Sequence, residues 1–248
     1  MRAIYVLWIR QLKRYSRSRS RIIGSLGQPI LFLVALGFGL GPIFKKAGGG
    51  NYIDFLVPGV IAQGILFTSI FSGVELIWDR QFGFLKETLV APVSRLSIML
   101  GRTLGGATIA TLQGIIILIL TIIIGFNPES ASSVLIAIVF MFLISLLFTA
   151  LGTAIASLLT DFQGFQLIMN FLVMPLFFLS GALFPLKGAP LFLQLISKFN
   201  PLTYGVDSLR EILTSVSHLG VGTDFAVLSV LALITLSVGS YLFSKIQV

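Results

Sequence analysis

Six long apolar stretches constrain this chain more than any other feature of its sequence. They cover roughly residues 22–44, 53–78, 98–126, 134–159, 166–186 and 225–243. A helix that crosses the hydrocarbon core of a bilayer needs about 20 consecutive, largely apolar residues. Inside a bilayer, only helices and closed barrels satisfy their own backbone polar groups. We therefore expect an all-α membrane protein with six transmembrane helices.

The composition supports this class. Hydrophobic residues make up 56% of the 248 residues and charged residues only 10%, whereas soluble domains carry about 25% charged residues. The chain has no cysteine and a single histidine, His218, so disulfides, thiol chemistry and histidine-ligated metals are not expected. Its net charge of +8 favours anionic lipid head groups over nucleic acid as partners, because the basic residues flank apolar stretches. No linker interrupts the chain, which indicates one domain over residues 1–248.

Lysine and arginine are distributed unevenly between the two sides of the predicted bundle. Seven precede the first stretch, four lie in residues 79–102 and Lys245 follows the last stretch, while five occupy the opposite side. Cytoplasmic loops carry the excess of basic residues in membrane proteins. We therefore expect a multi-pass protein of the plasma membrane with both termini and residues 79–97 in the cytoplasm, and residues 187–222 outside.

The first 21 residues have the pattern of an amphipathic helix. At about 100° per residue, a basic face lies opposite a face that carries Trp8. This pattern is typical of a helix that lies in the membrane interface. The alternative is a basic tail that only sets the topology. The basic face contains Arg10, Lys13, Arg14 and Arg17.

Two helical runs precede the last apolar stretch. They cover residues 191–199 and 203–213 and are separated by Asn200 and Pro201. Each is too short to cross a bilayer. We expect an external helical hairpin that dips into the membrane edge, with a plain amphipathic loop as the alternative.

A short charged segment, "WDRQFGFLKETLVAPVSR", separates the second and third stretches. Asp79 could cap a helix at the start of this segment. Pro92 disfavours helix at the residue before it and so ends the helix. Ser94 could then cap the next span. The segment therefore predicts a short helix with defined ends in the cytoplasm.

This short helix has one apolar face. Phe82, Leu85 and Leu89 share the face, and Lys86 and Glu87 lie off it. The face could rest on the membrane surface, or it could dock another protein as an amphipathic helix docks into a groove.

The spans themselves offer little chemistry. Glu75 is the one carboxylate well inside a predicted span, where an ionisable residue is a functional candidate. It could pair with Arg80 as a structural charge, or it could act in gating or substrate binding. No phosphate-binding loop of the pattern G-x-x-x-x-G-K-[ST] occurs, so the chain is not expected to be an ATPase or to hold a cofactor. Two G-x-x-x-G pairs, Gly37 with Gly41 and Gly101 with Gly105, predict close helix packing.

Two blocks of sequence resemble a known family. "WDRQFGFLKETLVAPVSRLSIMLGRTL" and "LSGALFPL" followed by "FNPLTYGVDSLREIL" are similar to the permease subunit of type-2 ABC exporters, in particular the daunorubicin-resistance-like drug-export branch. The predicted spans and the basic amphipathic N-terminus extend the resemblance over essentially the whole chain.

The resemblance implies a coupling helix over residues 83–91, with Gly83 and Phe84 as its first residues. This helix would seat in a groove on a separate ABC ATPase. The N-terminal helix would flank that contact. The permease would act as a dimer, most simply a homodimer, and the ATPase would bind ATP and magnesium. Gln81 departs from the family pattern, because many relatives carry an acidic residue there.

The resemblance also implies ATP-driven export of an amphiphilic, drug-like or lipid-like substrate from the cytoplasm. A polysaccharide or lipid-linked glycan exporter is the nearest alternative. An ion- or proton-coupled secondary transporter is an alternative of another class. An intramembrane enzyme is disfavoured because no catalytic constellation is present.

Overall fold

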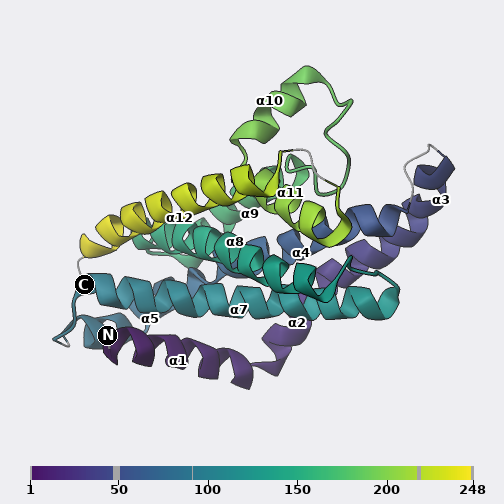
Figure 1. The fold of residues 1–248 in the computed structure, drawn as a ribbon. Helices are drawn as coiled ribbons and strands as arrows, with labels where there is room; N and C mark the ends of the chain where they lie inside the picture. The colour runs from purple at the N-terminus through teal and green to yellow at the C-terminus, as the bar shows by residue number, and fades with distance from the viewer. Residues whose placement is uncertain (1, 47–50, 91, 217–218, 247–248) are drawn as a thin grey trace.

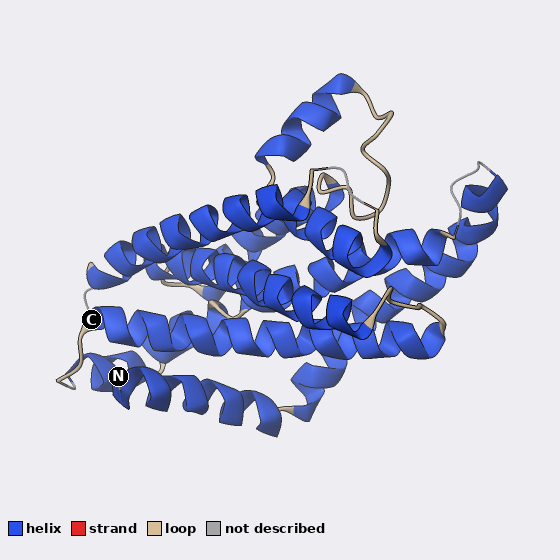
Figure 2. Ribbon diagram, viewed as in Figure 1, coloured by secondary structure: helices blue, strands red, loops and turns tan. Residues whose placement is uncertain are grey.

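The computed structural model describes residues 2–46, 51–90, 92–216 and 219–246. In these ranges the chain consists of helices joined by loops, with no strand (Figures 1 and 2), so the all-α class is confirmed. The helices are α1 (Arg2–Arg17), α2 (Arg19–Phe32), the π-helix η1 (Leu33–Phe38), α3 (Gly39–Lys46), α4 (Tyr52–Phe71), α5 (Val74–Gln81), α6 (Phe84–Val90), α7 (Arg95–Ile124), α8 (Ala131–Leu158), α9 (Phe162–Phe178), α10 (Leu191–Phe199), α11 (Pro201–Thr214) and α12 (Val221–Ser244).

Five helical stretches of the described chain are long and apolar enough to cross a membrane. They are Ile22–Lys46, Tyr52–Gln81, Arg95–Ile124, Ala131–Leu158 and Val221–Ser244. The predicted stretch 166–186 corresponds to α9, which has 17 residues. At 1.5 Å per residue α9 is about 25 Å long, which is shorter than the hydrocarbon core of about 30 Å. The sixth crossing therefore stays a prediction.

The chain beyond α9 continues as a buried, non-helical turn. Ser180 and Ala182 are buried there, and the backbone of Ala182 lies directly against Gly59 of α4. A Cβ atom at Gly59 would come within 2.4 Å of the carbonyl oxygen of Ala182, so only glycine permits this approach. The apolar run after Phe178 thus packs inside the protein instead of extending the helix.

Helices α4 and α5 form the centre of the structure. Of the most apolar window in Tyr52–Gln81, 78% is buried, against 17% in both the first and the last candidate span. α4 packs against α7, α8 and α11. The first and last spans therefore expose their apolar surfaces at the periphery.

The N-terminal helix α1 packs along the first half of α7. Gly101 and Gly105 of α7 face α1 at close range, since a Cβ at Gly101 would lie 2.8 Å from Cβ of Leu7 and one at Gly105 would lie 2.7 Å from Cβ of Gln11. The side chain of Trp8 donates to the hydroxyl of Thr108 at 3.0 Å. The expected helix is present, but its packing against another helix was not predicted.

The two glycines of the other predicted pair differ in their surroundings. A Cβ at Gly37 would lie 3.5 Å from the side chain of Ile53, whereas one at Gly41 would have no atom within 4 Å. Within this chain only Gly37 is in a packing contact, so close packing through the Gly37–Gly41 pair stays a prediction. Between them the chain passes through the end of η1, which runs from Leu33 to Phe38.

Both predicted helical runs before the last span are present, as α10 and α11. Asn200 separates them and caps α11, accepting from the backbone N–H of Leu202 at 3.0 Å. α10 exposes most of its apolar residues, including Leu191. α11 instead packs against α4, α8 and α12, so only α10 projects from the body as an external hairpin would (Figure 1).

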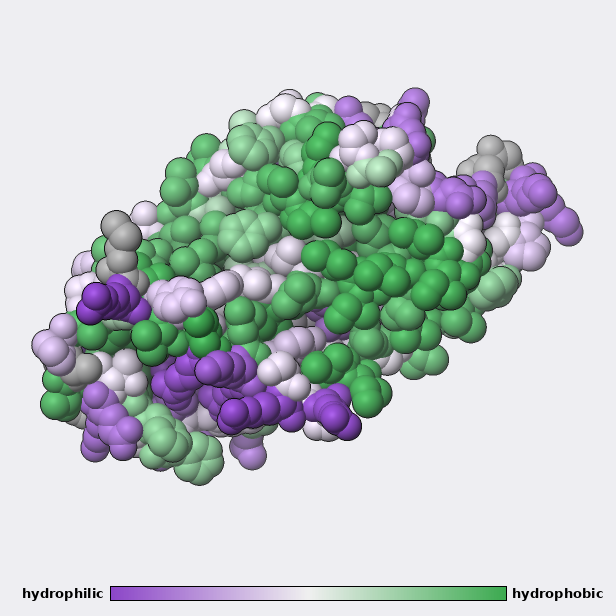
Figure 3. All heavy atoms as spheres, turned by 60° about the horizontal axis from the view of Figure 1, so that its bottom comes forward, coloured by the Kyte–Doolittle hydropathy of each residue, from purple (hydrophilic) through white to green (hydrophobic). Residues whose placement is uncertain are grey.

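The two termini lie at the same end of the structure (Figure 1). Arg95, the first residue of α7, donates to the carbonyl oxygens of Ser244 and Ile246 at 2.7 Å each. On the face shown in Figure 3, hydrophilic side chains gather over α1 at this end, while the middle of the molecule is largely hydrophobic. This polarity fits a helix bundle whose two ends face water.

Replacing Gly101 with valine should detach α1 from α7, because the new side chain would enter the space of Leu7 and of the backbone of Ile4. We expect faster tryptic cleavage within α1 of the purified protein. Gly41→Val is the matched control, since that position has open space around it. Equal cleavage rates in the two variants would contradict the observed α1–α7 packing.

Candidate coupling site

A buried ion-pair network surrounds α5, the helix that leads into the predicted coupling segment. Asp79 is 3% exposed and accepts from Arg102 of α7. Its other oxygen lies 3.5 Å from Arg10 and 3.7 Å from Arg14, both on α1. Three arginines from two helices therefore converge on one carboxylate. A buried charge is tolerated only when it is paired in this way.

Glu75, one turn earlier on α5, belongs to the same network. It is buried and lies 3.8 Å from Arg14. The expected partner was Arg80, but Arg80 donates to the carbonyl oxygens of Leu159 and Ser157 at 2.9 and 3.4 Å. These carbonyls are at the C-terminal end of α8, where unpaired acceptors and the helix dipole favour a cation. α5 is therefore fastened to α1 and α7 through carboxylates and to α8 through Arg80.

The basic face of α1 has two different roles. Arg10 and Arg14 reach the carboxylates of α5, while Lys13 and Arg17 are exposed to the surroundings. The opposite face does not lie free: Trp8 contacts α7, and the hydroxyl of Tyr15 donates to Gln113 of α7 at 2.9 Å. α1 therefore connects α5 to α7. Its contact with lipid remains an expectation.

The predicted cap of the coupling helix is wrong. Asp79 lies inside α5 and is engaged by arginines, so it does not cap α6. The chain turns instead at Gly83, which has φ +80° and precedes α6. L-residues other than glycine rarely adopt this conformation. A glycine hinge thus separates α5 from α6.

The apolar face of α6 differs from the expected one. Leu85 is completely buried in the core and Leu89 is partly buried against it. Phe82, Phe84 and Val90 are exposed, with exposed fractions of 73%, 51% and 86%. Leu85 therefore anchors α6 to the body, and the exposed apolar surface consists of the other three side chains. We refer to Phe82, Phe84 and Val90 as the α6 surface.

The remaining predicted residues frame this surface. Lys86 and Glu87 are exposed on α6, and Pro92 is exposed in the turn before α7. Ala91, the predicted last residue of the coupling helix, lies outside the described residues. Ser94 caps α7 as predicted and accepts from the backbone N–H of Ser97 at 3.2 Å.

Arg102 is the functional candidate that the sequence analysis missed. We counted it only as a basic residue of the cytoplasmic side, but its side chain is buried beside Asp79. The signal was present, since an arginine seven residues into a long apolar helix requires a buried partner. Spacing alone could not identify Asp79, because the two residues belong to different helices.

The two carboxylates of this site are held in ion pairs. Glu75 lies 3.8 Å from Arg14, and Asp79 pairs with Arg102. Within the described ranges, the carboxylates close enough to share an ion belong to α11 and α12; they are Asp207, Glu211 and Asp224. The site therefore consists of the short exposed helix α6, which follows a turn at Gly83. Before this turn lies α5, which is joined to the central helix α4.

Replacing Asp79 with alanine should destabilise the protein strongly, because Arg102 would remain buried without its ionic partner. Breaking a buried pair costs about 3–5 kcal/mol, whereas an exposed pair contributes about 0–1 kcal/mol. Arg10→Ala, at a side chain that is 42% exposed, is the matched control. Thermal unfolding of the purified variants should therefore show a large fall in Tm for Asp79→Ala only. Equal Tm values would contradict the central role of Asp79.

Comparison with known proteins agrees with this architecture. The family model described as ABC-2 type transporter matches residues 2–214. A putative transport permease ycf38 of Cyanophora paradoxa is 31% identical over 214 residues, which cover 84% of this chain and 72% of that protein. Nodulation protein J of Rhizobium leguminosarum bv. trifolii is 30% identical over 194 residues, which cover 77% of this chain and 73% of that protein. The chain therefore belongs to the ABC-2 type transporter family and is a membrane permease of that family.

Proposed function

We propose that this chain is the membrane-spanning subunit of an ATP-driven exporter that moves an amphiphilic, drug-like or lipid-like substrate out of the cytoplasm. Membrane components of this family lack their own ATPase domain and work with an ABC ATPase. The observation that carries the proposal is the α6 surface, an exposed apolar patch beside the buried charges of α5. ATP and magnesium belong to the partner subunit.

The α6 surface is suited to dock the ATPase. Burying a phenylalanine or valine side chain stabilises a contact by about 1.5–3 kcal/mol. Lys86 and Glu87 lie beside the surface and could form polar contacts at its rim. Leu85 anchors α6 in the core, and Gly83 connects α6 to α5. The outer side of α6 remains exposed. Movement of the ATPase would then reach α5 and, through it, α4.

A cavity between the α1–α2 elbow and α4 is a candidate part of the substrate path. It has a volume of about 350 Å³, and its wall includes Phe67, Phe71 and Gln63. The side-chain amide of Gln63 is buried and has no hydrogen-bond partner among the described residues. Apolar walls with a few polar groups are typical of small-molecule sites. The free amide also suits hydroxyl groups, which keeps a polysaccharide or lipid-linked glycan as the second candidate substrate.

The peripheral helices provide surfaces for a second permease copy. Ile23, Leu31 and Phe38 of the first span are exposed, as is Phe171 of α9. We infer a homodimer in the plasma membrane, with lipid covering the remainder of this surface. Both termini would face the cytoplasm, because the basic residues are concentrated at their end of the bundle.

Replacing Phe84 or Val90 with glutamate should weaken binding to the ATPase by more than tenfold, since each 1.4 kcal/mol corresponds to a factor of ten. The measurement is co-purification of the ATPase, together with ATP-driven export. Leu191→Glu on α10 is the control, because Leu191 is equally exposed and apolar but lies away from α6. Leu85→Glu should reduce the yield of folded protein instead. Normal co-purification and export with both α6 variants would refute the docking proposal.

The proposed orientation can be tested by thiol labelling, since the chain has no cysteine of its own. An impermeant reagent applied to intact cells should label cysteine at Lys198 and not at Ser94. Both positions are exposed in the structure. Permeabilised cells should label both positions, which controls for reactivity. The opposite pattern in intact cells would invert the proposed topology.

A further inference from the structure

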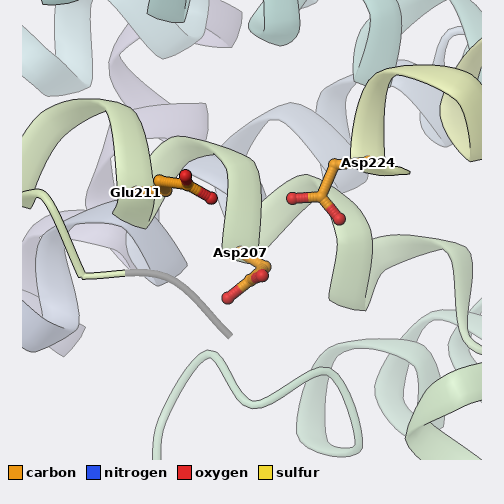
Figure 4. Close-up of side chains that lie close together, drawn as sticks. All are labelled: Asp207, Glu211 and Asp224. Atoms are coloured by element: carbon orange, nitrogen blue, oxygen red, sulfur yellow. The ribbon is translucent and has the colours of Figure 1, made fainter. Parts of the chain in front are cut away.

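Three carboxylates lie close together where α11 meets α12 (Figure 4). This junction is distant from α5 and the termini (Figure 1). Asp207 and Glu211 are one turn apart on α11, and Asp224 lies in the first turn of α12. One oxygen from each carboxylate lies within 4.8 Å of the others. Close acidic groups repel one another strongly, so their arrangement needs a compensating positive charge.

Asp224 provides a separate observation that points to a ligand. Its exposed fraction is 0%, and neither of its carboxylate oxygens has a hydrogen-bond partner. In Figure 4 this carboxylate points toward the side chains of Asp207 and Glu211. Buried carboxylates are normally paired or bound to a metal ion. An unpartnered, fully buried carboxylate directed at two others is therefore the arrangement expected around a cation.

The two carboxylates of α11 differ in their surroundings. Oε2 of Glu211 is buried without a hydrogen-bond partner. Oδ2 of Asp207 accepts from the backbone N–H of Leu219 at 2.8 Å, which holds that carboxylate in position. Among the described residues, no lysine or arginine forms an ion pair with Glu211 or Asp224.

Arg210 is a buried cation on the same helix as Asp207 and Glu211, but its guanidinium donates to other partners. It donates to the carbonyl oxygens of Gly181 and Phe55 at 3.0 and 3.3 Å and lies 4.1 Å from the centre of the Phe55 ring. Burial lowers the pKa of Arg210 to about 10, while Asp207 opposes this shift, so Arg210 remains charged at neutral pH. Arg210 therefore donates to backbone carbonyls and to neither Glu211 nor Asp224.

We propose that Asp207, Glu211 and Asp224 bind one calcium ion. Calcium takes six to eight oxygen ligands at about 2.3–2.6 Å and accepts carboxylates in one- or two-oxygen modes. Three carboxylates supply up to six oxygens. Zinc prefers nitrogen and sulfur ligands, and magnesium demands a near-ideal octahedron, so both fit this set less well. Asp207 also lines a cavity of about 420 Å³, from which water could complete the coordination shell.

The ion would fasten α11 to α12. Two ligands come from a helix that packs against α4 and α8, and the third comes from the start of the peripheral last span. Under the orientation of the proposed function this end faces outside, where calcium-binding modules typically have a Kd of about 10⁻⁴–10⁻³ M. The inference concerns the fold of this chain, so it can hold or fail independently of the transported substrate.

The test is calcium titration of the purified permease after removal of metals with EDTA. We expect one calcium ion per chain by isothermal calorimetry, with a higher Tm on saturation. Asp224→Asn and Glu211→Gln should each weaken binding by tenfold or more. In saturating calcium, Asp224→Asn should have a lower Tm than the wild type, because it removes one carboxylate ligand of the ion.

Asp54→Asn is the matched control, because it removes a carboxylate of the first turn of α4 that is not part of the cluster. It should bind calcium as the wild type does. Absence of calcium binding by the wild type, binding of magnesium without calcium, or unchanged calcium affinity in both Asp224→Asn and Glu211→Gln would overturn the proposal. Glu211 is only partly buried, so Glu211→Gln tests the site even if Asp224→Asn does not fold.

Discussion

The buried pair of Asp79 and Arg102 is the interaction on which the end of the bundle near the termini depends. In a protein whose spans contain few charges, this pair lies between α5 and α7 and also draws α1 inward through Arg10 and Arg14. Removing water from two charges is costly, and the cost is recovered only with good geometry and additional partners. The network therefore contributes more to defining a single packing arrangement of α1, α5 and α7 than to the free energy of unfolding.

This arrangement explains why α6 can be both exposed and firmly held. α5 is fixed on one side by arginines and on the other by the contacts of Arg80 with the end of α8. Only Phe82 and Gly83 separate this helix from α6. α5 and α4 are joined by a short turn, and α4 is the most buried of the long helices. Under the proposed function, a displacement of α6 would therefore reach the core through two consecutive helices.

Much of the fold could be predicted from the sequence, because hydrophobic runs of span length have few alternatives in a membrane. Local signals also located the α10–α11 break at Asn200 and the cap at Ser94. The side on which each residue packs was less predictable. Leu85 was expected on the docking face because it shares a helical face with Phe82, yet the hinge at Gly83 turns that face inward. The partners of Asp79 and Glu75 lie on other helices, and Asp224 of the acidic cluster is 13 positions from Glu211 and on another helix, so periodicity could not reveal either. We expected no metal site, since the chain has no cysteine and a single histidine.

The π-helix in the first span changes which residues of that span share a helical face. Each π turn contains more residues than an α turn because its hydrogen bonds reach one residue further. A helical wheel drawn at a constant 100° through Leu33–Phe38 therefore falls out of phase with the real helix. Gly37, inside η1, lies close to Ile53 of α4, whereas Gly41, beyond η1, has no atom within 4 Å of its Cβ position. The residues before and after η1 are offset in angle around the helix axis. A continuous apolar stripe on this span therefore cannot be assigned from i+3 and i+4 spacing. Any interface built on the first span must then be defined separately for its two halves.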